Sequence, residues 1–224
     1  MTGTSLPAAV ADEAEARAAI VAAMRRLDAS GLNRGASGNV SLRHGTAMLI
    51  TPSAVAPADL TPDLVAKIDL AAEDGAFEGP RRPSTEWRFH RDILRARPDV
   101  NAVVHTHSPH VTVLAIARRP IPAVHYMIAG FGGPEIRCSG YATFGTEELS
   151  RRALAALDGR NGCLLANHGG ITVAPTLSRA LWLAVEMETL AFQYHQSLLI
   201  GGPVILSDAE IAAAAAKFAD YGAK

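Results

Sequence analysis

Apolar residues along the chain follow two spacings, a helical one in long alanine-rich segments and a continuous one in short runs that end in turns. Residues 12–29 carry Ile20, Met24 and Leu27 at helical spacing, and Gly31 follows as a stop signal, so this segment is predicted to be a helix. Further helix starts are predicted where a capping side chain or a proline precedes an apolar pattern: Ser84 or Thr85, Ser108-Pro109, Thr146, Thr176 and Ser207.

Short apolar runs bounded by turn residues predict strands. The predicted strand segments are residues 39–50 as a pair around an Arg-His-Gly-Thr turn, 73–79 as a hairpin tip, and 101–106 and 162–167 as buried strands. Because strands and helices alternate without a repeat, a low-complexity tract or a linker, one α/β domain with a layered, mixed sheet is predicted for residues 1–224. Residues 1–10 and 222–224 are expected to be flexible.

Composition narrows the classes of protein to which the chain can belong. With 224 residues, of which 49% are hydrophobic and 5% aromatic, the chain can bury a sizeable aliphatic core. The formal net charge is −1 and charges of both signs are interspersed, so no nucleic-acid partner is expected. Neither a signal peptide nor an apolar stretch of about 18 residues is found, so no membrane span is expected. Cys138 and Cys163 are too few for a disulfide framework, which favours free thiols and a cytoplasmic location.

Histidines gather in residues 103–110, Val-Val-His-Thr-His-Ser-Pro-His. Alternate side chains of a strand share a face, so His105 and His107 should point the same way from the end of a buried strand. Two imidazoles on one face can bind a single cation, but a zinc site needs at least three protein ligands. The pair alone therefore leaves two interpretations open, a metal site and an ordinary polar strand end.

His168 is the candidate for a third ligand. It follows an apolar run and precedes Gly169-Gly170, so it should stand on a tight glycine turn at the end of a buried strand. His110 competes with it, but His110 lies a turn into the predicted helix and should point away. The remaining histidines are interpreted as surface or structural residues: His44, His90, His125 and His195.

Glu86 is predicted to lie in the first turn of the helix that Ser84 or Thr85 caps. A carboxylate there is stabilised by the helix dipole, so Glu86 can serve simply as an acid of the capping region. The other interpretation makes it a general base beside a bound cation. The sequence pattern by itself favours neither.

Several loops have the small residues, hydroxyl groups and free backbone N–H groups that bind an anion. They are residues 37–39 (Ser-Gly-Asn), residues 51–54 (Thr-Pro-Ser-Ala) and the Ser84-Thr85 pair at a helix start. Each alone is an ordinary turn or cap. If the loops converge in space, they indicate a phosphorylated substrate.

The order of these motifs resembles the class II aldolase/adducin family, and the likeness runs from about Arg17 to Gly222. The matching motifs are Ser-Gly-Asn, Thr-Pro-Ser, Pro-Ser-Thr-Glu, His-Thr-His-Ser-Pro and Asn-His-Gly. Within the family, the likeness is strongest to the L-fuculose-1-phosphate aldolase branch. The segments that carry this finer likeness are residues 121–129, 141–146, 180–184 and 206–222.

The resemblance implies a three-layer fold with a mostly antiparallel or mixed sheet flanked by helices. It implies a zinc-dependent aldolase without a Schiff base, with Mn²⁺ as an alternative metal, assembled as a homotetramer with active sites between subunits. The substrate would be a small phosphorylated sugar such as L-fuculose 1-phosphate, cleaved to dihydroxyacetone phosphate and a short hydroxyaldehyde. The matching residues are, for the metal, His105, His107, His168 and Glu86; for proton transfer, Glu86, Tyr126 from a neighbouring subunit, and Tyr221; for the phosphate, Gly38, Asn39, Ser53, Ala54, Ser84 and Thr85; and, beside the aldehyde pocket, Phe144 and Phe218.

Two positions depart from the family pattern. Ala54 stands where the family commonly has glycine, and alanine disfavours a positive φ and narrows the room for a phosphate oxygen. Phe131 lies in a glycine-rich loop that replaces an alanine-richer stretch, and it is expected to reshape the aldehyde pocket. Other activities remain as alternatives: a 5-deoxyribulose-1-phosphate aldolase, a sugar-acid phosphate decarboxylase, an L-ribulose-5-phosphate 4-epimerase, and a non-catalytic adducin-like interaction module.

Overall fold

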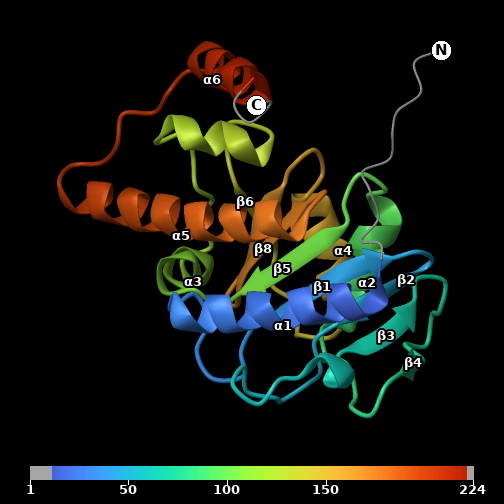
Figure 1. Ribbon diagram of the computed structural model, residues 1–224. Coiled ribbons are helices and arrows are strands. Elements are labelled where there is room, and N and C mark those ends of the chain that lie inside the picture. The colour runs from blue at the N-terminus through green and yellow to red at the C-terminus, as the bar shows by residue number, and fades with distance from the viewer. Residues whose placement is uncertain (1–11, 221–224) are drawn as a thin grey trace, which may run out of the picture.

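The computed structural model describes residues 12–220, in which helices cover both faces of a central sheet (Figure 1). The predictions for residues 1–10, residues 222–224 and Tyr221 lie outside this described part of the chain. The helices are α1 (Glu13–Ala29), α2 (Trp87–Ala96), α3 (Pro109–Ile116), α4 (Glu147–Ala156), α5 (Leu177–Leu199) and α6 (Asp208–Asp220), with the short 3₁₀ helices η1 (Pro62–Leu64) and η2 (Tyr126–Phe131).

The sheet has eight strands in the order β4-β3-β2-β1-β5-β8-β7-β6. The strands are β1 (Asn39–His44), β2 (Ala47–Ile50), β3 (Ala66–Asp69), β4 (Phe77–Glu78), β5 (Ala102–Thr106), β6 (Arg137–Cys138), β7 (Gly162–Leu165) and β8 (Gly169–Ala174). Strand β6 pairs parallel with β7, and the other neighbours in this sheet pair antiparallel. The predicted fold class, an α/β fold with a mixed and mostly antiparallel sheet, is confirmed.

Alternation of side chains along the strands divides the core into two layers, one packed against α1, α3 and α5 and the other against α2 and α4. In β5, Val104 belongs to the first layer and Val103 to the second. His105 shares the face of Val103 and so points toward α2, where its ring centroid lies 5.5 Å from that of Phe89. Phe131 is fully buried in the first layer and does not line the pocket described below, so any effect on the aldehyde pocket would be through packing.

Most of the predicted helix starts are confirmed by their caps. The hydroxyl groups of Thr146 and Thr176 accept hydrogen bonds at 3.2 and 3.3 Å from backbone N–H groups three residues ahead. Ser207 and Glu210 form the predicted capping box, each side chain accepting from the backbone N–H of the other. These local patterns are set by neighbouring residues, which is why the sequence predicts them well.

The start of α2 differs from the prediction. The helix begins at Trp87, and Glu86 occupies the N-cap position in place of Ser84 or Thr85. The Glu86 carboxylate makes no capping hydrogen bond; instead the Ser84 hydroxyl accepts one from the backbone N–H of Glu86 at 3.3 Å. Glu86 thus lies at the helix start, where the dipole favours a carboxylate, but its side chain caps no backbone group and is free for contacts with the sheet.

The glycine pair Gly169-Gly170, predicted to be a tight turn, instead begins strand β8. The turn lies just before it, where Asn167 adopts a left-handed φ of 56°. A Cβ on Gly169 would lie 2.3 Å from the carbonyl oxygen of Thr106, so glycine is needed for the close approach of β8 to β5. The β7–β8 turn itself presents His168 beside the end of β5.

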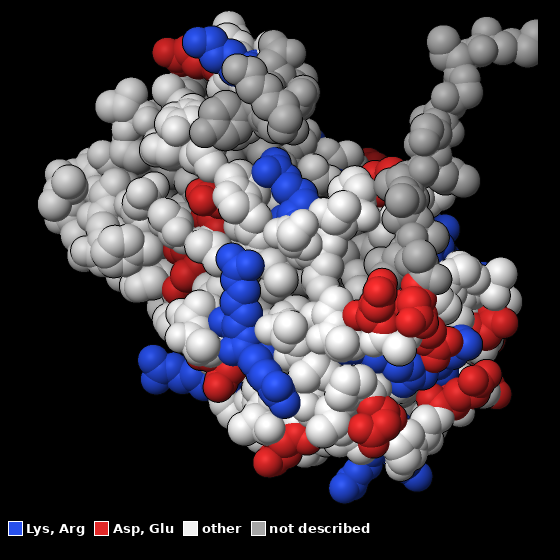
Figure 2. Space-filling model, in the orientation of Figure 1, with Lys and Arg blue, Asp and Glu red and all other residues white. Residues whose placement is uncertain are grey.

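Acidic and basic side chains are interspersed on the face of the molecule drawn in Figure 2, consistent with the net charge of −1. Between Asp12 and Asp220, no helix combines the length and the apolar character needed to cross a membrane. Cys163 is buried and Cys138 is half-buried, and both are free thiols as predicted.

Candidate active site

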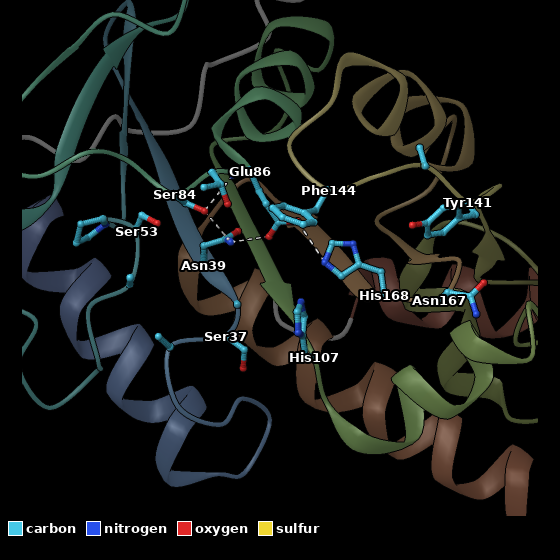
Figure 3. A pocket seen from close by; sticks show the side chains of 16 residues that line it. Ser37, Asn39, Ser53, Ser84, Glu86, His107, Tyr141, Phe144, Asn167 and His168 are labelled. Atoms are coloured by element: carbon cyan, nitrogen blue, oxygen red, sulfur yellow. Dashed lines mark hydrogen bonds and ion pairs between the residues drawn. The ribbon is translucent and has the colours of Figure 1, made fainter.

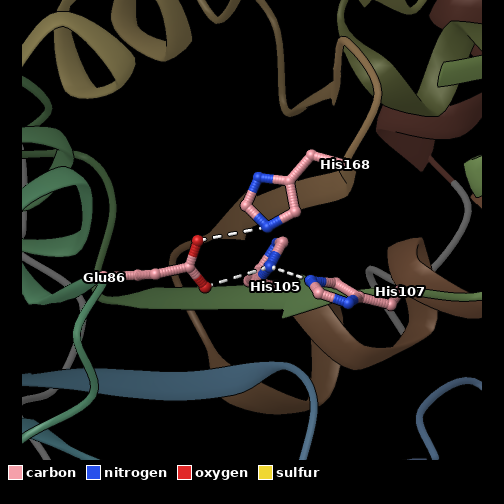
Figure 4. A group of neighbouring side chains, drawn as sticks. All are labelled: Glu86, His105, His107 and His168. Carbon is pink, nitrogen blue, oxygen red and sulfur yellow. Dashed lines mark hydrogen bonds and ion pairs between the residues drawn. The ribbon is translucent and has the colours of Figure 1, made fainter. Parts of the chain in front are cut away.

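Potential metal ligands from distant parts of the sequence meet where β5 ends beside the start of α2 and the β7–β8 turn (Figure 4). His105 lies in β5, His107 follows that strand, His168 lies in the turn, and Glu86 precedes α2. Their ligand atoms all lie within 4.8 Å of one another. The described chain thus carries a metal-binding group of three histidines and one glutamate.

The three imidazole rings form a nearly equal-sided triangle. Their centroids are 4.8 to 4.9 Å apart, and the ring planes of each pair meet at 71 to 77°. The Nδ1–H of His105 donates to the carbonyl oxygen of Gly170 at 2.9 Å, which leaves Nε2 as the atom with the free lone pair. That Nε2 faces the Nε2 of His107 at 2.9 Å. Two ring nitrogens that face each other so closely need a cation or a proton between them.

Glu86 closes the remaining side of this group. Its Oε2 lies 3.2 Å from Nε2 of His105, and its Oε1 lies 3.2 Å from Nε2 of His168. Oε2 also accepts a hydrogen bond from Nδ2 of Asn39 at 2.9 Å, whereas Oε1, although buried, accepts none. A buried carboxylate oxygen without a donor is unfavourable unless a cation or a substrate meets it.

Burial keeps two of the imidazoles neutral. It lowers the pKa of His107 to about 3 and the pKa of His168 to about 4, and repulsion from His105 acts in the same direction. For Glu86, burial opposes ionisation, but attraction to His105 and hydrogen bonding outweigh it, so the pKa of Glu86 lies well below its usual range. At neutral pH, His107 and His168 therefore offer neutral ring nitrogens and Glu86 offers a carboxylate, the forms that bind a metal ion.

The donor set fits a divalent cation. Imidazole nitrogens together with a carboxylate suit zinc and other transition metals. The unpaired Oε1 of Glu86 and the facing Nε2 atoms converge, and the Nδ1–H bond of His105 supplies the outer contact that orients a metal-binding imidazole. A metal-binding role explains why three polar rings and an acid share this site.

A pocket of about 350 Å³ opens from the metal-binding group (Figure 3). Glu86, His107 and His168 form part of its wall, so the group is reached from the pocket. Every residue predicted to grip a phosphate lines it as well: Gly38, Asn39, Ser53, Ala54, Ser84 and Thr85. The anion-binding loops, which lie far apart in the sequence, thus converge on one pocket.

Ala54 adopts the left-handed conformation that glycine would take without strain. Its φ is 56°, in a region that disfavours L-residues by roughly 1–2 kcal/mol. Its side chain is exposed, and the residue still lines the pocket. Ala54 therefore strains the loop without turning it away from the pocket.

The protein is similar to aldolases over nearly its whole length. A family model described as the Class II Aldolase and Adducin N-terminal domain matches residues 18–195. A 5-methylthioribulose-1-phosphate/5-deoxyribulose-1-phosphate aldolase from Rhodospirillum rubrum is 53% identical over 206 residues, which cover 92% of each chain. The L-fuculose phosphate aldolase of Escherichia coli strain K12 is 49% identical over 193 residues, 86% of this chain and 88% of that one. The chain belongs to the class II aldolase and adducin family.

A solved structure of an L-fuculose 1-phosphate aldolase is similar to the structure of this chain, with a TM-score of 0.88 and 35% sequence identity. The match covers 96% of this chain and 100% of the other. Sequence identity is nevertheless higher to the Rhodospirillum rubrum enzyme, at 53%, than to the Escherichia coli L-fuculose phosphate aldolase, at 49%. The predicted family is therefore confirmed, whereas the predicted greater likeness to its L-fuculose branch is not. The metal-binding group and these relatives place the chain among the metal-dependent aldolases of the family.

The residues predicted to transfer a proton to the aldehyde or to line its pocket lie apart from the metal-binding group, as does the competing ligand His110. Tyr126 is exposed and lines a second cavity between α5 and α6, with its ring centroid 6.3 Å from that of Phe218. Phe144 lines the pocket of the metal-binding group. His110 lies outside that group, as predicted, and its ring packs against Phe192 with centroids 4.8 Å apart.

The sequence analysis assigns no site role to three residues near the aldolase pocket. Tyr141 and Asn167 line the pocket wall opposite the anion-binding loops (Figure 3). Asn167 carries a usable signal, because an asparagine before His168 and two glycines suits a left-handed turn residue. His90, interpreted as structural, is fully buried and hydrogen-bonds to Asn39.

Proposed function

We propose that this class II aldolase reversibly cleaves a ketose 1-phosphate to dihydroxyacetone phosphate and a short aldehyde. The observation that carries the proposal is the convergence of the metal-binding group and the anion-binding loops on one pocket. Relatives named as aldolases of 5-deoxyribulose 1-phosphate and of L-fuculose phosphate support it. Zn²⁺ is the metal that the ligand set favours, with Mn²⁺ as the alternative.

A divalent cation held by His105, His107 and His168, with Glu86 as a further ligand only until substrate binds, would supply a Lewis acid for the negative charge that develops on substrate oxygens. The side chains contribute proton transfer and orientation. In the direction of C–C bond formation, Glu86 removes a proton from the carbon of dihydroxyacetone phosphate that becomes the nucleophile. Its Oε1 is the oxygen available for this step, because Oε2 is held by the Asn39 amide.

That carbon then attacks the carbonyl carbon of the aldehyde, and the aldehyde oxygen takes up a proton as it becomes a hydroxyl group. We assign this proton to Tyr126 of the partner subunit, because the Tyr126 of the same chain lines a different cavity. This assignment requires a homo-oligomer, proposed to be a tetramer, with active sites between subunits. Tyr221 is assigned as a second tyrosine of the site from the family resemblance alone.

The phosphate end of the pocket has a hydroxyl group prepared to donate. Ser84 Oγ accepts hydrogen bonds from Nδ2 of Asn39 at 3.0 Å and from the backbone N–H of Glu86 at 3.3 Å. Both lone pairs are thereby used, so the hydroxyl proton remains to donate to a phosphate oxygen. The backbone N–H groups of residues 37–39 and 53–54 would add further donors.

The opposite end of the pocket is lined by aromatic and apolar groups, with Tyr141, Ala142 and Phe144 in its wall. Such a surface suits an aldehyde that carries a methyl or methylthio group. Three substrates meet this condition: L-fuculose 1-phosphate, 5-deoxyribulose 1-phosphate and 5-methylthioribulose 1-phosphate. They would release lactaldehyde, acetaldehyde and methylthioacetaldehyde, respectively.

The test is to incubate the Zn²⁺-loaded enzyme with dihydroxyacetone phosphate and each of these aldehydes, with glycolaldehyde for comparison. We expect a ketose 1-phosphate product by mass spectrometry with at least one aldehyde, and no product after chelation until metal is restored. The proposal fails if the metal-loaded enzyme is inactive with every aldehyde. Purification without bound metal would instead favour the adducin-like interaction module.

Glu86→Gln is the sharpest variant for the proposed mechanism. Glutamine keeps the size of the side chain and an oxygen for the Asn39 amide, but it cannot take up a proton. We expect the variant to bind metal through the three histidines and to lose roughly 10²–10⁴-fold in kcat. Undiminished turnover with metal bound would show that Glu86 is not the base.

A further inference from the structure

A fully buried histidine that the mechanism above does not use connects strand β1 to Glu86. His90 lies in α2 and is 0% exposed. Its Nδ1 lies 2.7 Å from the Ser41 hydroxyl, and its Nε2 contacts Oδ1 of Asn39. Asn39 and Ser41 are two residues apart in β1, so they share the sheet face toward α2 and a single imidazole bridges them.

The direction of each hydrogen bond in this chain follows from the carboxylate at its end. The ionised Glu86 only accepts, so Nδ2 of Asn39 must face it and Oδ1 of Asn39 must face His90. An amide oxygen also only accepts, so Nε2 of His90 carries the proton and Nδ1 accepts from the Ser41 hydroxyl. Donation therefore runs from Ser41 to His90, from His90 to Asn39, and from Asn39 to Glu86.

The Asn39 amide uses both of its hydrogens on groups of the proposed active site. One is donated to Oε2 of Glu86 at 2.9 Å and the other to the Ser84 hydroxyl at 3.0 Å. An amide rotated by half a turn would place its oxygen against the carboxylate and could no longer donate to either group. The Nε2–H of His90 opposes that rotation, because it donates to the amide oxygen in the observed orientation.

His90 is itself firmly held. Its ring stacks on Phe89 with centroids 4.6 Å apart and planes 22° apart, and the rings of Phe89 and His105 meet in a T-shaped contact. Burial lowers the pKa of His90 to about 3, so the ring stays neutral near neutral pH. One tautomer in one orientation is therefore available to Asn39.

We propose that His90 is a positioning residue for the aldol reaction. Its Nε2–H fixes the Asn39 amide, which holds Oε2 of Glu86 and leaves Oε1 as the oxygen that exchanges the proton with substrate. The inference rests on the proposed function, because it presupposes that Glu86 is the base. The expected signature is a fall in kcat larger than the change in KM, since the metal ligands and most of the phosphate-binding groups are untouched.

A matched pair of substitutions separates this role from packing. In His90→Gln the side-chain amide reaches the place of Nε2 and can still donate to Asn39, whereas in His90→Asn it reaches only the place of Nδ1 and can meet only Ser41. Both remove the ring from the core, so both should lower the melting temperature. We expect His90→Asn to lose at least tenfold in kcat and His90→Gln to stay within about threefold of the wild type, with full metal content in both.

Asn39→Ala gives a second readout, because His90 is proposed to act through Asn39. Adding His90→Asn to Asn39→Ala should lower kcat by less than twofold further. Equal losses in His90→Gln and His90→Asn, or independent losses from Asn39→Ala and His90→Asn, would overturn the proposal. Inactivity of the wild-type enzyme on every aldehyde would contradict the proposed function. The tautomer of His90, rather than kinetics, would then test this inference.

A measurement on the unaltered holoenzyme covers the case in which His90→Asn does not fold. Nitrogen NMR of ¹⁵N-histidine-labelled enzyme distinguishes the two neutral tautomers from the imidazolium, and the signals of His90 are identified by their loss in His90→Gln. We expect a neutral ring with its proton on Nε2. A proton on Nδ1, or a doubly protonated ring, would reverse the donation to Asn39 and exclude the proposal.

Discussion

At Ala54 the backbone takes a left-handed φ of 56° beside the proposed phosphate site, and the residue has a Cβ that opposes this conformation. Ala54→Gly should remove the strain and raise the free energy of unfolding by up to about 1 kcal/mol, because the gain of roughly 1–2 kcal/mol is partly offset by the flexibility of glycine in the unfolded chain. Urea unfolding measures this change. The KM for dihydroxyacetone phosphate should also fall as the loop gains room.

The matched control is Ala58→Gly in the following turn, where the backbone does not have a positive φ. There glycine only adds freedom to the unfolded chain, so it should lower the free energy of unfolding. Equal destabilisation by the two substitutions would mean that Ala54 is not strained in solution.

His90 should make the stability of the fold depend on pH. Its pKa is about 3 in the folded protein against 6.5 for an unperturbed histidine, so between these values the unfolded chain takes up a proton and the folded one does not. The contribution of His90 to the free energy of unfolding is therefore complete well above pH 6.5 and decreases as the pH falls. At pH 5 the decrease from this residue alone is about 2 kcal/mol. Urea unfolding of wild type and His90→Gln at pH 8 and 5, at one protein concentration, should show a smaller loss in the variant.

Single residues differ in how far sequence can assign them. His105 and His107 are predictable as a pair, because the two-residue period of β5 continues to His107, one residue past the end of the strand. Glu86 is not decided by sequence, since its role depends on β5 and the β7–β8 turn lying beside the start of α2. His90 carries no local signal at all, because its partners Asn39 and Ser41 come from a strand about fifty residues earlier.

At the scale of elements, the site depends on how closely β8 approaches β5. Gly169→Ala would place a Cβ 2.3 Å from the carbonyl oxygen of Thr106 and 3.0 Å from the His107 ring. Since the backbone at Thr106 cannot move without moving His107, we expect metal affinity to fall by about 10–100-fold, as for other changes that disturb ligand orientation. Competition with a coloured chelator measures this affinity.

Gly162→Ala is the control for this prediction, because it alters a glycine of β7, the strand that pairs with β8. Its Cβ would meet Cε of Met187 and Cδ1 of Phe131, each at 2.8 Å, in the core layer away from the metal-binding group. We expect a lower melting temperature and nearly unchanged metal affinity. Loss of metal from both variants to the same extent would show that packing in general, not the contact with Thr106, holds the site.

Elements with local signals are the ones that sequence predicts correctly. The caps at Thr146 and Thr176 lie next to the groups that they satisfy, so their hydrogen bonds follow from neighbouring residues. Gly169-Gly170, the first two residues of β8, are predicted to be a turn because a glycine pair usually marks one. Their actual purpose, room for a neighbouring strand, is visible only once β5 and β8 are paired.

For the whole molecule, one chain does not assemble all the groups that the proposed reaction needs. Tyr126 is 54% exposed and lines a cavity other than the pocket of the metal-binding group. Large apolar side chains are exposed on α3, at the end of α5 and in the loop that follows α5, among them Ile116, Leu199, Ile200 and Val204. Exposed apolar surface of this kind is typical of contacts between proteins. Both features support the proposed homo-oligomer with active sites between subunits.

Hybrid oligomers test this sharing directly. Glu86→Gln chains keep Tyr126 but lack the base, Tyr126→Phe chains keep the base, and each variant alone should be nearly inactive. If the site combines Glu86 of one subunit with Tyr126 of the partner subunit, equal co-expression should restore about a quarter of wild-type activity by random assortment in a symmetric ring.

The same two proteins mixed after separate assembly should show no recovery, which controls for any residual activity. Sedimentation velocity must show a single oligomer in every sample, and hybrids that stay inactive would mean that both residues act from one subunit or that Tyr126 does not serve the reaction.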